Sequence, residues 1–213
     1  MLNALYDTTV TVLSDGLAYL TQTELKPELK KLYSEVSEIA ETSMKITQKT
    51  LSNLPILDSV TKEILRMCNP VILHARKLNS PLKMKKQDKV VKIPFSESMN
   101  FDVLVLLGVM SRETDYFGQD SDKFRPSRWR ERNEKGMFQS KVDKKYASVP
   151  FLTGPRSCMG RYFATYLIKV ALIFLVGEFD MRCVESGLER KKLTAAELMV
   201  KFKEEPGIDF FVR

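Results

Sequence analysis

The chain has 213 residues, of which 44% are hydrophobic and 29% are charged. This length and balance suit one globular domain, or part of a larger one, with a substantial buried core. The three cysteines argue against a secreted disulfide scaffold and for a reducing compartment, and the single histidine excludes a histidine-rich metal site.

The net charge of +7 is concentrated in short basic clusters within 83–89, 141–145 and 190–192. We interpret the clusters as solvated loops, and the alternative is a basic face that steers an acidic partner protein. Nucleic-acid binding is not expected, because the clusters are scattered and carry no interleaved aromatic residues. The most apolar run, 167–176, is far shorter than the roughly 20 residues that cross a bilayer, so no membrane span is predicted.

In chain order, apolar residues at helical spacing first predict three helices, at Leu2 to Tyr19, Glu28 to Thr42 and Leu57 to Cys68. The first contains Asp7-Thr8-Thr9 within an apolar pattern, which predicts either a bent buried helix or a functional kink. The second has one apolar and one charged face, as is typical of a surface helix. The polar segment 42–53 is interpreted as a loop or a frayed helix end.

Short strands are predicted next, at Val71 to Leu73, Val90 to Ile93 and Phe101 to Leu107. The last of them is almost entirely apolar, as expected for a strand buried on both faces. A charged irregular loop is predicted at Arg130 to Tyr146, followed by an apolar helix at Arg161 to Val176. Two paired terminal strands are predicted at Phe179 to Cys183 and Gly207 to Val212. The predicted fold class is therefore mainly α with small β-sheets, an α+β fold.

A loop rich in turn residues runs from Phe151 to Gly160 and leads directly into the last helix. Its one thiol, Cys158, lies just before the helix N-terminus, where free backbone N–H groups and the helix dipole favour a thiolate. Gly154 and Gly160 allow positive φ and a close approach of something flat, while Arg156 suits a carboxylate. This combination would suit a metal-bearing macrocycle with acidic side arms, and the alternative is a buried structural cysteine before a core helix.

The residues of this loop resemble the haem-ligand signature of cytochrome P-450 monooxygenases, F-x-x-G-x-R-x-C-x-G, and every fixed position matches. Three other segments resemble motifs of the same family and follow its order. Ala4 to Thr9 resembles the oxygen-binding segment of a central helix. Glu63 to Arg66 resembles the E-x-x-R pair, and Phe124 to Trp129 resembles the F-x-P-x-R-W run. Leu5 departs from the family pattern, which has a glycine at that position.

The resemblance implies a haem b cofactor with the thiolate of Cys158 as the axial ligand of the iron. It implies that Arg156 and Arg76 hold the haem propionates, although a surface arginine is the alternative for Arg76. Phe151, Gly154 and Gly160 would complete the cofactor-binding loop. In the family, the acid and alcohol at the positions of Asp7 and Thr8 relay protons to the oxygen-binding site.

For Glu63 and Arg66 the resemblance implies a buried network with Arg128. The alternative for this pair is an ion pair exposed on a helix surface, which contributes little to stability. Buried charges persist only when they are fully paired, so the first interpretation predicts a large loss of stability when one partner is removed.

The motifs cover almost the whole chain but match only the second half of the family, so residues 1–213 are expected to form a single partial domain, the C-terminal haem-binding half. The implied function is insertion of one atom of O2 into an apolar small molecule, with electrons from an NADPH-dependent reductase. The similarity is greatest to fungal members of secondary metabolism. The alternative is a truncated, non-catalytic remnant that binds haem weakly or serves as an interaction module. The resemblance implies a location on the cytoplasmic side of a membrane. A full-length form could be associated with the endoplasmic reticulum.

Overall fold

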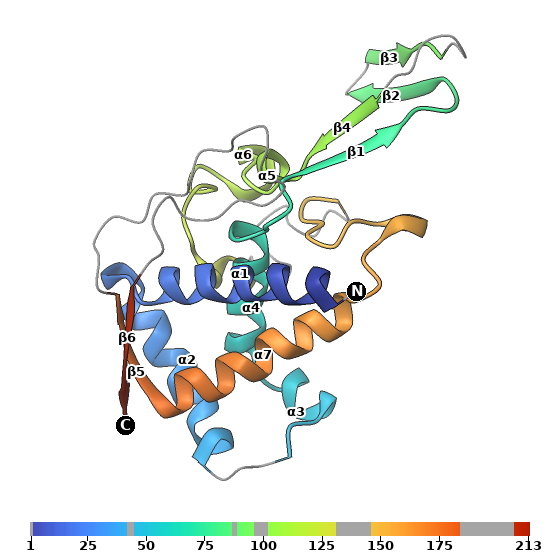
Figure 1. The fold of residues 1–213 in the computed structure, drawn as a ribbon. Helices are drawn as coiled ribbons and strands as arrows, with labels where there is room; N and C mark the ends of the chain where they lie inside the picture. The colour runs from blue at the N-terminus through green and yellow to red at the C-terminus, as the bar shows by residue number, and fades with distance from the viewer. Residues whose placement is uncertain (1, 42–44, 87–88, 96–101, 131–145, 184–206) are drawn as a thin grey trace.

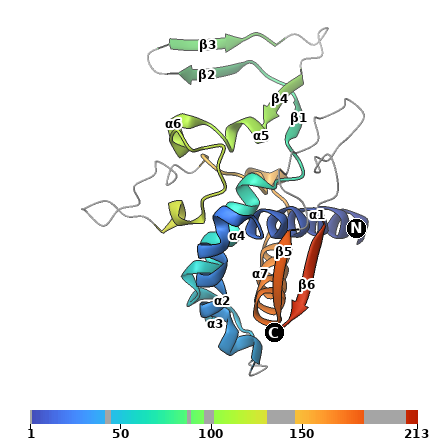
Figure 2. The ribbon, with the colours of Figure 1, turned by 90° about the vertical axis from the view of Figure 1, so that its left-hand side faces the viewer.

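The structure is a computed structural model and describes residues 2–41, 45–86, 89–95, 102–130, 146–183 and 207–213. Within these ranges the chain is mainly helical, with three antiparallel sheets of two strands each (Figure 1). The predicted fold class, mainly α with small β-sheets, is therefore confirmed. The sheets lie at the periphery of a helical core (Figure 2).

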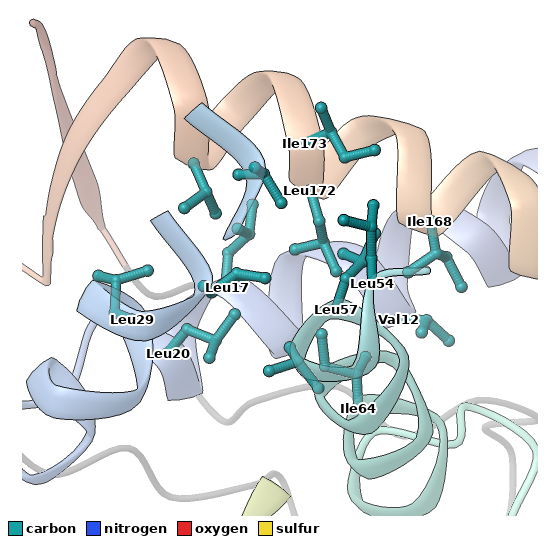
Figure 3. Packing of buried hydrophobic residues seen from close by; sticks show 14 of the residues in the cluster. Val12, Leu17, Leu20, Leu29, Leu54, Leu57, Ile64, Ile168, Leu172 and Ile173 are labelled. Atoms are coloured by element: carbon teal, nitrogen blue, oxygen red, sulfur yellow. The ribbon is translucent and has the colours of Figure 1, made fainter. Parts of the chain in front are cut away.

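The core is made by four helices: α1 (Leu2–Leu20), α2 (Lys26–Glu41), α4 (Pro55–Met67) and α7 (Arg161–Glu178). Their apolar side chains meet in one buried cluster (Figure 3), whose fully buried members include Leu20, Leu32, Leu57, Ile64 and Leu172. All four helices form where helical periodicity predicts them, with ends shifted by a few residues. α1 is one uninterrupted α-helix through its three threonines.

Close packing of α2 against α7 depends on the absence of a side chain at Gly177, where an added β-carbon would collide with the side chain of Ala40. Replacing glycine by alanine inside a helix ordinarily stabilises it by about 1 kcal/mol. We expect the opposite sign for Gly177→Ala, a loss of about 1–3 kcal/mol from overpacking, measured by urea denaturation. The double variant with Ala40→Gly should recover part of the loss. A stabilised Gly177→Ala variant would contradict this packing.

The segment 42–53, predicted as a loop or frayed end, contains a short helix, α3 (Gln48–Ser52). Thr47 and Thr50 cap it reciprocally: the N–H of Thr50 donates to Oγ1 of Thr47 at 3.1 Å, and the N–H of Thr47 donates to Oγ1 of Thr50 at 3.4 Å. Such a reciprocal cap stabilises the first turn of even a short helix, which the polar composition alone did not indicate.

The strands β1 (Leu73–Lys77) and β4 (Asp102–Leu106) pair antiparallel. β1 begins later than predicted, because Asn69 Oδ1 accepts the N–H of Val71 at 3.1 Å and holds the chain in a turn. The prediction that 101–107 is buried on both faces is wrong. In the described chain β4 has only β1 as a neighbouring strand, and its residues alternate between exposed and half-buried.

Two short helices, α5 (Leu107–Met110) and α6 (Thr114–Phe117), follow β4. The basic cluster within 83–89 was interpreted as a solvated loop, but it belongs to a hairpin of β2 (Leu82–Lys86) and β3 (Lys89–Ile93). The predicted terminal pair is confirmed as β5 (Phe179–Cys183) and β6 (Ile208–Val212). The predicted loop 130–146 falls largely outside the described residues, as do the basic clusters 141–145 and 190–192. No described helix combines the length and apolarity needed to cross a membrane.

Candidate haem-binding site

The loop before α7 is held in shape by its own backbone. A 3-10 turn, Gly154–Arg156, brings the N–H of Ser157 to the carbonyl of Gly154 at 3.0 Å. The N–H of Cys158 donates to the carbonyl of Phe151 at 2.9 Å, which closes the loop. The ring of Phe151 packs partly buried against the core cluster, so the loop is anchored at one end. Cys158 is exposed at the other end.

Two residues of the loop have positive φ, Leu152 at 60° and Gly154 at 76°. Glycine at 154 is explained by this conformation and not by crowding, because no atom of the described chain would lie within 4 Å of a β-carbon at that position. Leucine rarely adopts positive φ, and such strain is often found at functional sites. Nothing in the sequence indicated the conformation of Leu152, because no residue type in the loop marks it.

Gly160 differs from the expectation, since its φ of −84° is open to any residue. A β-carbon there would lie 3.9 Å from Cys158 Sγ, so the glycine leaves the thiol side of the loop uncrowded. α7 begins at Arg161, and its first N–H groups have no partner within the helix. Within the described ranges no three His, Cys, Asp or Glu side chains gather, so Cys158 belongs to no cluster of protein ligands there.

The two predicted propionate ligands both keep their guanidinium groups free of acidic partners among the described residues. Arg156 is exposed on the loop. Arg76 is half-buried on β1, where Nη1 donates only to the carbonyl of Ala75 at 3.2 Å. His74 lies on the same face of β1, and burial, with a smaller contribution from the charge of Arg76, lowers its pKa below the ordinary value.

On α1, Asp7 is exposed and Thr8 is half-buried. Both lie near the N-terminal end of α1, which is on the same side of the core as the N-terminal end of α7 (Figure 1). Thr9 is buried, and its hydroxyl has no hydrogen-bond partner among the described residues. The sequence contained Thr9 in the same run but did not distinguish it from Thr8. The structure thus places the predicted proton relay, Arg76 and Cys158 on three separate elements: α1, β1 and the loop before α7.

The predicted network of Glu63, Arg66 and Arg128 is formed by direct hydrogen bonds between the three side chains. Arg66 donates two hydrogen bonds to the carboxylate of Glu63, from Nε to Oε2 at 2.9 Å and from Nη2 to Oε1 at 2.7 Å. Arg128 Nε donates to the same Oε1 at 3.0 Å. All three side chains are 0% exposed, so the alternative of a surface ion pair is wrong.

Further groups that the sequence did not reveal complete this network. Trp129 Nε1 donates to Glu63 Oε2 at 2.8 Å, and the N–H of Arg125 donates to Oε1 at 2.7 Å. Arg66 also donates to three backbone carbonyls, those of Ser111, Ser121 and Lys123. Backbone carbonyls carry no residue signature, which explains why sequence alone could not identify them. Of these further groups, only Trp129 had a signal in the sequence, as the last residue of the F-x-P-x-R-W run.

Asp120 supports Arg128 from the surface side, with Oδ1 at 3.4 Å from Nη1. Burial acts to raise the pKa of Asp120, but the charges of Arg128 and Arg125 together hold that pKa below its ordinary value. Glu35 of α2 positions α4, because its two carboxylate oxygens accept the N–H groups of Ile56 and Leu57 at 2.9 and 2.7 Å. The network is therefore held in place from several elements.

Comparison with known proteins gives one consistent result. The family model for cytochrome P450 matches residues 1–207. Cytochrome P450 4V2 of Mus musculus is 32% identical over 198 residues, which cover 90% of this chain and 33% of that protein. The bifunctional cytochrome P450/NADPH–P450 reductase ALT2 of Alternaria alternata is 32% identical over 178 residues, covering 83% of this chain and 14% of that protein.

Among solved structures, the haem domain of cytochrome P450DA superposes with a TM-score of 0.73 at 22% identity, which shows the shared fold. The superposition covers 97% of this chain and 42% of that domain. The chain spans about a third of the length of the mouse relative. Because the family model covers almost the whole sequence and the fold agrees, the chain belongs to the cytochrome P450 family.

Proposed function

We propose that residues 1–213 form the haem-binding C-terminal part of a monooxygenase that inserts one oxygen atom from O2 into an apolar small molecule. Proteins of this family carry haem b with a cysteine thiolate as the axial ligand of the iron. The observation that carries the proposal is the exposed thiol of Cys158, presented by a strained loop immediately before α7.

The described residues fit haem b, a flat macrocycle with two carboxylate arms. Cys158 is exposed, and the open space at Gly154 and Gly160 lets a flat group approach the backbone. Within the described ranges, Arg156 and Arg76 have no carboxylate partner, so their guanidinium donors are available to the carboxylates of the haem. When bound, the haem supplies the redox chemistry that activates O2.

The protein groups have separate roles in this proposal. Cys158 would ligate the iron, while Phe151 holds the ligand loop against the core. The N-terminal end of α7 favours negative charge at the sulfur. Arg156 and Arg76 would hold the propionates of the haem.

Proton supply is assigned to α1. Asp7 is exposed and can exchange protons with water, and Thr8, half-buried next to it, can pass a proton inward through its hydroxyl. Tyr6 and Val10 are exposed apolar side chains one helical turn apart on the same helix, 68% and 43% exposed, and they support an apolar substrate. We assign no particular substrate.

The proposed electron donor is an NADPH-dependent reductase. The relative from Alternaria alternata supports it, because its name joins a P450 and an NADPH–P450 reductase in one chain. We propose the cytoplasmic side as the location, with attachment to the endoplasmic reticulum in a full-length form, and a fungal secondary-metabolite pathway as the context. The mouse relative shows that similarity at this level extends beyond fungi.

The test supplies the haem-loaded chain with a reductase, NADPH and a panel of apolar substrates, and measures NADPH consumption, hydrogen peroxide and hydroxylated product. We expect NADPH-dependent electron flow that ends mainly in peroxide, because Tyr6 and Val10 remain open to water and coupled turnover requires a closed pocket. A reaction without reductase is the control. If NADPH consumption does not rise above this control, the monooxygenase proposal fails and the alternative of a non-catalytic haem binder is favoured.

A further inference from the structure

Strand β1 carries two nitrogen-bearing side chains on one face. Its residues alternate between exposed and half-buried, so His74 and Arg76 share the half-buried face, roughly 7 Å apart along the strand. On β4 the residues directly opposite them are Val105 and Val103, which are also half-buried. This face of the β1–β4 pair therefore presents an imidazole and a guanidinium beside an apolar surface.

The described residues of the two strands place no acidic side chain on this face. Their one aspartate, Asp102, lies opposite Lys77 on the other, exposed face. The guanidinium of Arg76 donates to the carbonyl of Ala75 and has no counter-charge among the described residues. The complement of such a face is a group with an apolar body and a negatively charged end.

His74 contributes a buried nitrogen atom to the same face. Its Nε2 atom has no hydrogen-bond partner in the part of the chain that the structure describes. Buried polar atoms are nearly always hydrogen-bonded, because an unpaired one loses its contacts with water without replacement. Burial and the charge of Arg76 lower the pKa of His74, so its ring is neutral at pH 7 and has one N–H to donate.

The β1–β4 pair begins next to the loop that carries Cys158. Residues 147–150, which lead into that loop, line one cavity together with Leu107, the residue that directly follows β4. In both ribbon views β1 leaves the core beside the loop before α7 (Figures 1 and 2). A group bound at Cys158 therefore has β1 as a neighbour.

The charge of Arg76 discriminates between the possible partners of His74 Nε2. A water molecule or a neutral polar group would pair the nitrogen but leave the guanidinium without a counter-charge. A carboxylate has two oxygens and about four acceptor sites, so it can accept from the imidazole and from the guanidinium at once.

We propose that His74 is a further haem-binding residue, which donates from Nε2 to the propionate that Arg76 holds. Val103 and Val105 supply the apolar surface beside this carboxylate. The inference rests on the proposed function, because it takes haem b as the ligand of the chain. It adds a residue that lies outside the ligand signature.

The first test uses the single histidine of the chain as its own reporter. The nuclear magnetic resonance signal of the His74 Cε1–H is followed against pH in the haem-free chain and in the haem-loaded ferrous carbon monoxide form, which is diamagnetic. A carboxylate beside the imidazole favours its charged form, whereas burial alone disfavours it, so the pKa of His74 should rise when haem binds.

The two proposals fail in different ways in this test. A pKa of His74 that stays unchanged or falls, in protein that shows the thiolate-ligated Soret band, would overturn the role of His74 and leave the proposed function standing. Failure of the chain to take up haem would overturn both. A raised pKa without reductase-dependent NADPH consumption would support the role of His74 and contradict the monooxygenase.

The second test measures how fast ferric haem is lost to apomyoglobin. His74→Phe keeps a ring and removes the donor, so haem loss should be about tenfold faster, as expected when a hydrogen bond to a charged group is removed. His74→Gln retains an N–H donor and should restore most of the retention. The matched control, Lys77→Gln, removes a charge from the exposed face of the same strand and should not change the rate.

Circular dichroism should show wild-type helix content for all three variants, so that faster haem loss is not loss of fold. Equal rates in His74→Phe and Lys77→Gln, or no recovery in His74→Gln, would overturn the proposal. An acidic substrate is the other source of a carboxylate, so the pH titration is repeated with laurate. A pKa of His74 that rises only after laurate is added would assign the nitrogen to the substrate and overturn its assignment to haem.

Discussion

Replacing Cys158 by alanine is expected to abolish the red-shifted Soret band that thiolate-ligated haem shows when reduced under carbon monoxide. The band requires a thiolate on the iron, and Cys158 is the exposed thiol at the end of the ligand loop. The measurement is the difference spectrum of haem-loaded protein. The expected loss is complete, because the thiolate is removed and not merely weakened.

Two further cysteines provide the controls. Cys68 is buried in the core, and Cys183 ends β5. Cys68→Ala and Cys183→Ala should both retain the band, even if Cys68→Ala lowers stability through a small cavity. An unchanged spectrum in Cys158→Ala would show that another residue, or none, ligates the iron.

Replacing Glu63 by alanine should lower the free energy of unfolding by about 3–5 kcal/mol, the range found when one partner of a buried ion pair is removed. The carboxylate accepts from Arg66, Arg128 and Trp129. Its loss leaves Arg66 buried without a carboxylate partner among the described residues, and leaves Arg128 with Asp120 at 3.4 Å. Urea denaturation, followed by circular dichroism, gives the measurement.

A surface pair with the same spacing is the matched control. Lys31 and Glu28 are also three residues apart, with Nζ to Oε1 at 2.8 Å, but the Lys31 side chain is 56% exposed. Lys31→Ala should cost at most about 1 kcal/mol, because solvent screens exposed charges. If Glu63→Ala and Lys31→Ala shift the denaturation midpoint equally, the network does not carry the stability assigned to it.

Parts of the site were predictable because they depend on local order along the chain. The ligand signature lies within ten consecutive residues, 151–160, and Glu63 and Arg66 are three residues apart in one helix. Helical periodicity likewise located α2 and α7, since an apolar face repeats within each segment. For Arg128 the family motif was needed, because 65 residues separate it from Glu63.

The sequence by itself determined the fold class, the family, the four core helices and the identity of the ligand loop, all of which are carried by residues close together in the chain. Tertiary structure decided what depends on distant partners or on backbone atoms. β4 is half-exposed because it has one neighbouring strand in the described chain, a fact that its apolar composition concealed. Leu152 has positive φ within the loop that the hydrogen bond from Cys158 to Phe151 closes, and no leucine in a sequence signals that conformation. The carbonyls that bind Arg66 come from residues 45 to 57 positions away, so only the folded chain brings them together.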